Sequence, residues 1–281
     1  MTQLTISLAQ LDYHTGNFEK NKEKIIDQIA AAKAEQIDLI VFSELCICGY
    51  PPRDFLEFND FNARCLESVY EIATYCNGIA AIVGSPTVNP IPEGKDLYNS
   101  AYFLADGKVQ SVTNKTLLPN YDIFDEYRYF EPNRVFETIK FKGFNIALTI
   151  CEDLWNINDN PMYIMNPMDE LIKQKPDVMI NIAASPFNKT QIEQRKQVLI
   201  DNVTKYKVPL FYTNHIGAQT QLIFDGGSMV VNAQGEIIVQ EIPTQQVNFA
   251  SIPMMINLGY YIKADQIFEL KRVVLEKLKL M

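Results

Sequence analysis

The sequence predicts an α/β fold. Short runs rich in β-branched and other apolar residues alternate with longer stretches of helical periodicity, which is typical of α/β proteins. The chain has 281 residues, of which 47% are hydrophobic, and this is enough to fill the core of one large domain. No internal repeat, low-complexity tract or shift in composition marks a boundary. We therefore expect one domain over residues 1–264, followed by a helical tail or truncated linker at 265–281.

The first half of the chain predicts two helices that alternate with strands. Asn17 is a suitable N-cap for the first helix, in which Ile25 and Ile29 recur at helical spacing. The dipeptide Asp106-Gly107 stands between two apolar runs and favours a two-residue hairpin turn. The expected strands are Leu4–Ala9, Ile37–Phe42, Ile79–Val83, Leu97–Leu104 and Lys108–Thr113, and the second helix is expected over Asp60–Cys76.

The second half continues the alternation and ends in a segment of helical periodicity. Lys142-Gly143 separates two apolar runs and predicts another hairpin, and Ile267, Leu270 and Val274 give the last segment an amphipathic pattern. The expected strands are Val135–Phe141, Phe144–Ile150, Val178–Ile182, Leu210–Thr213, Ser228–Val231, Glu236–Gln240 and Val247–Ile252. The expected helices are Met168–Gln174, Gln191–Tyr206 and Asp265–Leu280.

Charge and hydropathy argue against two classes of partner. The chain carries 25 basic and 34 acidic residues, and its net charge of -9 does not suit a protein that neutralises nucleic-acid phosphates. No run approaches the ~20 apolar residues that a transmembrane helix needs, and the N-terminus lacks the pattern of a signal peptide. We therefore expect a cytoplasmic protein that binds neither nucleic acid nor membrane.

The five cysteines are expected to be free thiols, because an odd number without an export signal does not suggest a disulfide framework. Cys46 and Cys48 form a single C-x-C pair, and the chain has only two histidines, His14 and His215. Structural zinc sites need about four ligands at regular spacing, so we expect no metal site.

Three residues with catalytic chemistry stand at the ends of predicted strands. Glu44 and Lys115 each lie two residues after a strand, and Cys151 directly follows Phe144–Ile150. The carboxyl ends of strands line the ligand crevice of α/β sheets, so these side chains are expected to converge. A strand that delivers a cysteine into a sharp turn exposes its sulfur, and the next N–H groups are then free to bind an oxyanion.

A thiol nucleophile needs a base, because the pKa of a free cysteine is about 8.5. Histidine usually serves, and His215 follows the predicted strand Leu210–Thr213, so a Cys–His pair is one arrangement. In the other, the Glu44 carboxylate takes the thiol proton and the Lys115 ammonium stabilises thiolate and oxyanion. Spacing alone leaves both open, together with the ordinary alternative of a buried structural cysteine.

The segments around these residues form three motifs, Ser43–Asp54 with Glu44, Asn114–Pro119 with Lys115, and Cys151–Trp155. In their order and spacing they resemble the glutamate, lysine and cysteine motifs of the nitrilase (carbon–nitrogen hydrolase) superfamily. Gly-Tyr-Pro-Pro-Arg-Asp, Cys-Glu-Asp-Leu-Trp and the late segment Leu222–Ser228 are most similar to the amino-terminal glutaminase domains of glutamine-dependent NAD synthetases. The resemblance implies a four-layer α/β/β/α sandwich.

The resemblance also implies a mechanism. Cys151 would attack the side-chain amide of L-glutamine, form a glutamyl thioester and release ammonia. Glu44 would act as general base and then as general acid, while Lys115 and the backbone N–H after Cys151 stabilise the oxyanion. Glu126 matches a further acidic residue that such enzymes place near the nucleophile.

The substrate-binding residues that the resemblance implies are Tyr121, Glu152, Ser185 and Lys189. Tyr121 matches a tyrosine that lines the glutamine pocket, and Glu152 and Ser185 match positions that hold the amino and carboxylate ends. Lys189, in the short loop Phe187–Gln191, is expected to supply positive charge for the carboxylate.

No segment matches the Ser-Gly-Gly-x-Asp-Ser phosphate loop of the synthetase half of such enzymes. The resemblance therefore implies an ammonia-supplying glutaminase that carries no cofactor, while ATP and deamido-NAD would bind to a synthetase domain or subunit. The expected partners are L-glutamine, that synthetase and further copies of this chain, because family members associate through sheet and helix faces.

Two other functions stay open. One is a stand-alone amidase for another small ω-amide or carbamoyl compound, which would not need groups for both charged ends of an amino acid. The other is an assembly or regulatory module without catalysis. A reactive Cys151 thiol would favour an enzyme, and an inert one would favour the module.

Overall fold

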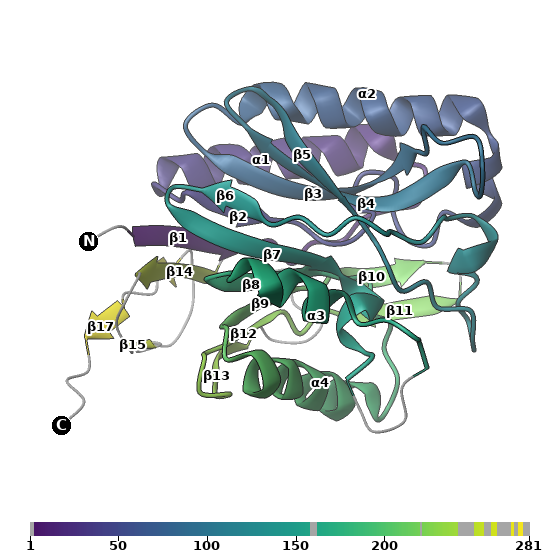
Figure 1. Ribbon diagram of the computed structural model, residues 1–281. Coiled ribbons are helices and arrows are strands. Elements are labelled where there is room, and N and C mark those ends of the chain that lie inside the picture. Colours follow the sequence, from purple (N-terminus) through teal and green to yellow (C-terminus); the bar gives the residue numbers. More distant parts are fainter. Residues whose placement is uncertain are drawn as a thin grey trace.

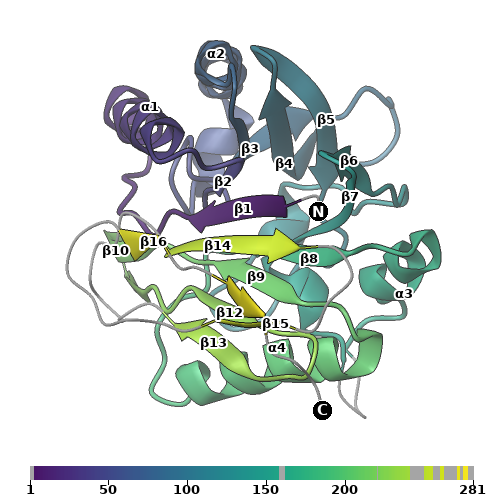
Figure 2. The same cartoon turned by 90° about the vertical axis from the view of Figure 1, so that its left-hand side faces the viewer.

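The computed structural model of the chain describes residues 3–157, 162–219 and 221–240, and the backbone of short strands at 250–255, 260–262, 271–272 and 275–277. Over these residues two β-sheets pack face to face, and helices cover the outer face of each (Figure 1). Figure 2 shows the four layers edge-on, and the expected α/β/β/α sandwich is confirmed. The helices are α1 (Phe18–Ala34), α2 (Asn59–Tyr75), α3 (Pro167–Leu171) and α4 (Gln191–Tyr206).

The larger sheet has the strand order β16-β14-β1-β2-β3-β4-β5 in the described part of the chain. Its strands are β1 (Gln3–Leu8), β2 (Leu39–Val41), β3 (Ala80–Val88), β4 (Leu97–Ala105), β5 (Lys108–Asn114), β14 (Ala250–Met255) and β16 (Lys271–Arg272). β1, β2 and β3 are parallel, whereas β3, β4 and β5 form an antiparallel meander. β2 and β5 therefore run in the same direction and end at the same edge of the sheet.

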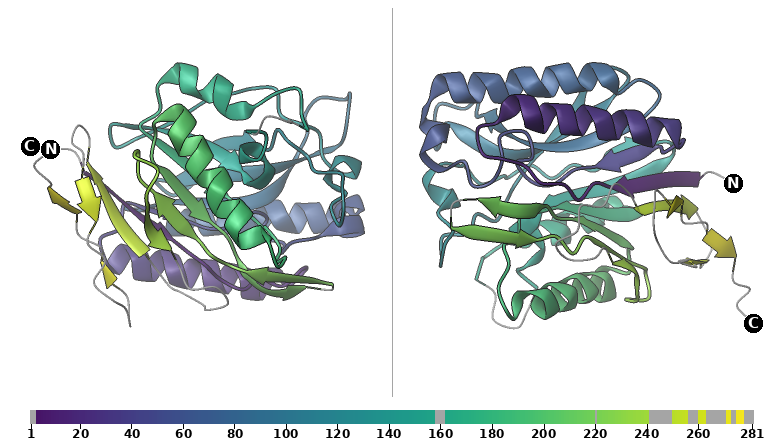
Figure 3. Two further views of the ribbon diagram at one scale, coloured as in Figure 1. Left: turned by 90° about the horizontal axis from the view of Figure 1, so that it is seen from below. Right: turned by 180° about the vertical axis from the view of Figure 1, so that it is seen from behind.

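The smaller sheet has the order β13-β12-β9-β8-β7-β6, again over the described residues. Its strands are β6 (Ile139–Phe141), β7 (Phe144–Ile150), β8 (Val178–Ile182), β9 (Leu210–Thr213), β12 (Met229–Val231) and β13 (Ile237–Gln240). β7, β8 and β9 are parallel, so the residues that follow them also share one edge. Figure 3 shows α4 along the outer face of this sheet, opposite the layer of α1 and α2.

The core has two parts, and β2 contributes to both. Leu39 and Val41 pack between the two sheets, while Ile40 and Phe42 on the opposite face pack against the layer of α1 and α2. This period of two confirms the expectation of a strand buried on both faces. Each such side chain contributes about 1.5–3 kcal/mol when it is fully buried.

The expected local signals are largely confirmed. Asn17 caps α1 through a hydrogen bond from the Lys20 N–H to its side chain. Asp106 and Gly107 have φ values of 52° and 73°, as the predicted two-residue hairpin turn requires. β3 is longer than expected because it pairs with β4 as far as Val88. A small hairpin of β10 (Ile216–Gln219) and β11 (Leu222–Asp225) was not expected, since each strand has only four residues.

The amphipathic helix expected over Asp265–Leu280 is wrong where the structure describes that segment. β16 pairs with β14, and β17 (Leu275–Lys277) pairs with β15 (Tyr260–Ile262). Strand partners satisfy the backbone groups of the described residues there. The remainder of 265–281, and Val247–Phe249 of another expected strand, lie outside the described residues.

Candidate active site

Cys151 directly follows β7 and begins the 3₁₀ turn η3 (Cys151–Leu154). Its φ of 43° lies in the left-handed region, which costs a residue other than glycine about 1–2 kcal/mol. Its side chain is 8% exposed. The predicted delivery of a cysteine into a sharp turn is therefore confirmed. Backbone strain of this kind gathers at functional sites.

The buried carboxylate of Asp153 holds this turn against the segment that follows Lys115. Oδ1 accepts hydrogen bonds from the N–H groups of Thr116 (2.9 Å) and Leu117 (2.8 Å), and Oδ2 accepts one from Ile150 (3.0 Å). One side chain thus joins the loop of the lysine motif to the end of β7. Sequence reasoning did not single out this aspartate, although it lies two residues after the expected nucleophile.

Glu44 lies in the loop after β2 and is completely buried. Its Oε1 accepts hydrogen bonds from Asn99 Nδ2 (2.7 Å) and Lys115 Nζ (2.7 Å), and its Oε2 accepts one from the Ala184 N–H (2.9 Å). Ala184 follows β8, so the last bond crosses from the smaller sheet to the larger one. The carboxyl edges of both sheets meet at this carboxylate.

Gly84 allows the Glu44 loop to lie directly on β3. A Cβ at this position would lie 2.7 Å from the Ser43 carbonyl oxygen and 2.8 Å from the Glu44 carbonyl carbon. Real Cβ contacts are essentially never this short, so any other residue would push the loop away. Gly84 lies just after the expected strand Ile79–Val83 but inside the longer β3, and a glycine inside a strand often marks a close approach of another backbone.

Lys115 follows β5 and is completely buried between two carboxylates. Its Nζ donates to Glu44 Oε1 at 2.7 Å and to Glu126 Oε1 and Oε2 at 2.9 and 2.8 Å. Tyr50 donates a further hydrogen bond to Glu126 Oε1 at 2.9 Å. The structure thus brings three of the predicted site residues into one network, which contains one positive and two negative charges.

Burial and neighbouring charges shift the pKa values in this network. Burial alone lowers the pKa of Lys115, but the Glu126 and Glu44 carboxylates outweigh it and hold the ammonium charged. Burial raises the pKa of Glu126 to about 7 despite the opposing effect of Lys115. Burial and the charge of Glu44 raise the pKa of Cys151, while Lys115 lowers it. The thiol therefore keeps its proton at neutral pH.

Glu152 lies next to Cys151 and is held by two tyrosines. The Tyr121 hydroxyl donates to Oε1 and Oε2 at 2.9 and 3.1 Å, and the Tyr163 hydroxyl lies 3.0 Å from Oε1. The structure thus joins two predicted substrate-binding residues. Tyr163 was missed, because the loop that carries it gives no sequence signal for its position. Burial raises the pKa of Glu152, and these hydroxyl groups oppose the shift.

The other two predicted substrate-binding residues occupy different environments. Ser185 is buried after β8, where its backbone N–H donates to Asn214 Oδ1 at 2.9 Å and its carbonyl accepts from Asn214 Nδ2 at 3.1 Å. Lys189 is exposed in the loop before α4. The structure therefore does not bring Lys189 to the buried network.

The two histidines contact groups other than the predicted catalytic residues. His14 Nδ1 lies 2.9 Å from Gln219 Nε2. His215 packs against Phe224, with 4.0 Å between ring centroids, and burial lowers its pKa to about 3. Neither ring nitrogen of His215 has a hydrogen-bond partner among the described residues. Glu44 and Lys115, the residues of the other arrangement that the sequence left open, are hydrogen-bonded to each other.

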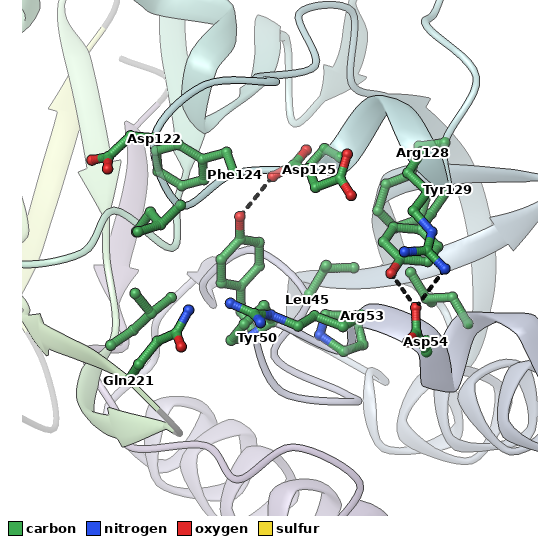
Figure 4. A pocket seen from close by; sticks show the side chains of 17 residues that line it. Leu45, Tyr50, Arg53, Asp54, Asp122, Phe124, Asp125, Arg128, Tyr129 and Gln221 are labelled. Atoms are coloured by element: carbon green, nitrogen blue, oxygen red, sulfur yellow. Dashed lines mark hydrogen bonds and ion pairs between the residues drawn. The ribbon is translucent and has the colours of Figure 1, made fainter.

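Two cavities open near this network and share the wall formed by Asp122–Phe124. One, of about 420 Å³, is lined by Tyr121, Trp155, Phe187 and Gln191 among others. The other, of about 380 Å³, is shown in Figure 4, where Tyr50 projects between the loops of Phe124 and Arg53. Tyr121 and Tyr50 connect the two cavities to Glu152 and Glu126 respectively.

The described residues were also searched for metal and membrane features. They contain no group of three or more His, Cys, Asp or Glu side chains that could hold a metal ion. Within the same ranges, every helix is too short or too polar to cross a membrane. All five cysteines are free thiols.

Comparison with known proteins identifies relatives of this chain. Residues 5–256 match the carbon-nitrogen hydrolase family. The glutamine-dependent NAD(+) synthetase of Synechocystis sp. is 38% identical over 241 residues, which is 83% of this chain and 43% of that protein. The enzyme of the same name from Thermotoga maritima is 35% identical, over 85% of this chain and 40% of that protein. The chain thus spans less than half the length of these curated relatives.

Solved structures show the same fold. The glutamine-dependent NAD+ synthetase of Acinetobacter baumannii, solved in complex with adenosine diphosphate, has a TM-score of 0.82 and 31% identity over 90% of this chain and 46% of that chain. An amidase from Nesterenkonia sp. has a TM-score of 0.71 and covers 89% of both chains. Its identity of 20% shows a shared fold alone.

Proposed function

Because this chain belongs to the carbon-nitrogen hydrolase family, we propose that it hydrolyses L-glutamine to glutamate and ammonia through a thioester on Cys151. The observation that carries the proposal is the ammonium of Lys115, buried between the carboxylates of Glu44 and Glu126. Burying three charges costs desolvation energy, and perturbed titratable groups of this kind gather at functional sites. The names of the curated relatives favour glutamine as the amide.

Glu44 is the proposed general base, because the Cys151 thiol holds its proton at neutral pH. Each carboxylate oxygen offers two lone-pair sites. Oε1 uses both, on Asn99 and Lys115, whereas Oε2 accepts only the Ala184 N–H among the described residues. The remaining site on Oε2 can take the thiol proton as sulfur attacks the amide carbon.

The rest of the reaction follows from the same proton. Glu44 returns it to the amide nitrogen, the C–N bond breaks, and ammonia leaves a glutamyl thioester on Cys151. Glu44 then takes a proton from water, which attacks the thioester carbon. The C–S bond breaks, glutamate leaves, and the proton returns to the Cys151 sulfur.

Lys115 and the backbone N–H after Cys151 are the proposed donors to the tetrahedral oxyanion. A lysine ammonium has three donors. One binds Glu44, and a single second N–H can serve both Glu126 oxygens, which leaves the third for the oxyanion. An oxyanion donor of this kind contributes roughly 10²–10³ in rate.

The substrate is proposed to enter beside Tyr121. The Glu152 carboxylate, oriented by Tyr121 and Tyr163, suits the ammonium end of an amino acid. Ser185 remains the proposed contact for the other end. Glu126 supports the site by holding Lys115.

The ammonia is proposed to serve glutamine-dependent NAD synthesis, as the names of the relatives suggest. ATP and deamido-NAD would then be bound by a synthetase domain or subunit, while this chain needs no cofactor for its own step. Association with that synthetase and with further copies of the chain is part of the proposal.

Glutamate release from L-glutamine tests the proposal, with the Cys151→Ala variant measured beside the natural chain. Cys76→Ala is the matched control, because Cys76 is an equally buried thiol at the end of α2. We expect turnover in the natural chain and in Cys76→Ala, none in Cys151→Ala, and a glutamyl adduct on Cys151 by mass spectrometry. Turnover that survives in Cys151→Ala, or glutamine left intact with no adduct, would refute the assignment.

A further inference from the structure

Asn99 contacts each charged residue of the network that Glu44, Lys115 and Glu126 form. It lies on β4 and is completely buried. Its side-chain Nδ2 donates to Glu44 Oε1 at 2.7 Å and to Glu126 Oε2 at 3.4 Å. Its backbone carbonyl accepts a hydrogen bond of 2.8 Å from the Lys115 N–H. One neutral residue therefore bridges the two carboxylates and holds the backbone of the cation between them.

The place of Asn99 on β4 is one that an apolar side chain would ordinarily occupy. Side chains alternate along a strand, and Ala101 and Phe103, on the same face as Asn99, belong to the core between the two sheets. An amide buried there costs free energy unless its hydrogen bonds are made. Asn99 Oδ1 has no partner among the described residues. What the position gains is the pair of donors on Nδ2, and both point at carboxylates.

The donors of Asn99 determine which oxygen of Glu44 is free. An N–H donor stabilises the charged form of a carboxylate. Asn99 and Lys115 together use both lone-pair sites of Oε1, so Oε2 is the oxygen that can still accept a proton. A half-turn of the Asn99 amide would place its Oδ1 against Oε1, and two acceptors would then face each other. The charged carboxylate thus holds the amide in the orientation that it needs.

The same donors decide which of the two carboxylates takes up a proton. Two carboxylates around one ammonium leave a negative charge in excess, and like charges that share a site favour protonation of one of them. Burial, together with the charge of Glu44, raises the pKa of Glu126 to about 7. A proton on Glu44 would remove the proposed base. The shorter of the two Asn99 bonds is the one to Glu44, so the amide favours charge on Glu44 and leaves the proton to Glu126.

We propose that Asn99 is a positioning residue that keeps Glu44 charged and leaves its Oε2 atom free for the proton of Cys151. The inference rests on the proposed amidohydrolase function and adds to it a residue that sets the pH range of the reaction. Asn99 acts through Glu44 and needs no contact with the substrate.

The pH dependence of kcat/KM for glutamate release from L-glutamine tests this role. Asn99→Leu removes both donors and places an apolar side chain among apolar neighbours. We expect the acid limb, where activity falls as Glu44 takes up a proton, to move upward by about one pH unit, a roughly tenfold loss of rate on that limb. Asn99→Asp keeps the shape of the side chain and adds a third carboxylate, so it should move the limb further in the same direction.

Asn202→Leu is the matched control. Asn202, on α4, is equally buried, and its Oδ1 also has no partner among the described residues. Its Nδ2 donates to the carbonyls of Leu154 and Val198, and neither partner is a carboxylate. This variant should unfold at a lower urea concentration and keep the acid limb of the natural chain. An equal move of the limb in Asn202→Leu, or an unmoved limb in a folded Asn99 variant, would overturn the inference.

A double variant tests the competition between the carboxylates. Glu126→Gln removes one of the two negative charges. In that background Asn99→Leu should move the acid limb by less than it does in the natural chain, because Glu44 no longer shares the site with a like charge. A shift of the same size in both backgrounds would contradict the proposed division of the proton.

Alkylation of Cys151 by iodoacetamide separates this inference from the proposed function. If the natural chain releases no glutamate, the proposed function fails, and the pH dependence of alkylation then tests Asn99 by itself. The same upward shift in Asn99→Leu would support its role toward Glu44 and the thiol. An alkylation profile that does not differ from that of the natural chain would overturn it.

Discussion

Two buried cations interact electrostatically with Cys151, and the protein neutralises them differently. Lys115, after β5, is bound by the carboxylates of Glu44 and Glu126. Arg195, on α4 beneath the smaller sheet, is bound by one carboxylate, Asp225, and by a backbone carbonyl. The first cluster has an excess negative charge, whereas the second is balanced.

The excess negative charge around Lys115 distinguishes a proton-exchanging cluster from the Arg195–Asp225 pair, which supports the fold. Burial, together with the charge of the second carboxylate, Glu44, raises the pKa of Glu126 to about 7, so this cluster exchanges protons near neutral pH. The Arg195–Asp225 pair has no surplus charge and ties α4 to the end of β11. We expect changes in the first cluster to alter catalysis and changes in the second to alter mainly stability.

The largest effect is expected for Lys115→Ala. It removes an oxyanion donor, worth roughly 10²–10³ in rate, and leaves two buried carboxylates unpaired, which costs about 3–5 kcal/mol of unfolding free energy. Glutaminase assays and urea unfolding would show both losses. Lys108→Ala, on the exposed start of the same strand, should behave like the natural chain, and a Lys115→Ala variant with full activity would remove Lys115 from the mechanism.

Arg195→Ala should lower stability by a similar amount, about 3–5 kcal/mol, because Asp225 is left buried without its partner. Below the melting transition, the rate of Cys151 alkylation should change less than tenfold. Arg195→Lys should recover part of the stability. If the Arg195→Ala variant folded but its Cys151 thiol were unreactive, the Arg195–Asp225 pair would also control the reactivity of Cys151. The distinction between this pair and the Lys115 cluster would then be wrong.

Glu126→Gln tests the excess charge through pH. Its folded pKa of about 7 exceeds the ordinary 4.5, so the folded state holds this proton more tightly than the unfolded state. The stability that the proton contributes is fully present below pH 4.5 and is lost as the pH rises through 7. The change is up to about 3 kcal/mol. Urea unfolding between pH 4.5 and 7.5 should show that the free energy of unfolding depends less on pH in Glu126→Gln than in the natural chain. An equal pH dependence in both would refute the raised pKa of Glu126.

The smallest of these effects is expected for Asp153→Asn, a buried acid bonded to backbone N–H groups and not to a cation. The amide can keep the two bonds at Oδ1, but its NH₂ group then faces the Ile150 N–H, which costs about 1–2 kcal/mol. Because this bond steadies the strained Cys151 turn, alkylation of the thiol should also slow. An unchanged alkylation rate at reduced stability would limit Asp153 to a structural role.

The catalytic candidates could be located from the sequence because each stands at a strand end. Apolar runs locate β2 and β7, and the residues after β2 and β5 share one edge of the larger sheet, while Cys151 follows a parallel strand of the smaller sheet. The motifs then selected Glu44 and Lys115 over the histidines. The four layers came from the same resemblance, since periodicity alone gives elements and not their stacking.

The predicted substrate-binding residues were located less well, because their positions depend on loop conformation and on contacts with residues from other elements. Lys189 was predicted because it is the basic residue nearest to Ser185 in the sequence, but its side chain is exposed in the loop before α4. Asn99 and Tyr163 reach the site from a strand face and a loop with no pattern to mark them. The amphipathic pattern after Asp265 failed because pairing partners, which the pattern does not reveal, give the described parts an extended backbone.

The bond from the Ala184 N–H to Glu44 crosses between the sheets, and the nucleophile and the carboxylate come from opposite halves of the sandwich. Neither half of the chain contains all the residues of the proposed site, so we expect separate fragments to need reassociation for the proposed activity. The proposed activity therefore depends on how the two sheets pack against each other. A molecule that bound either outer face and tilted one sheet would disturb this hydrogen bond and those that Asp153 accepts from Thr116 and Leu117, without ever entering the cavity.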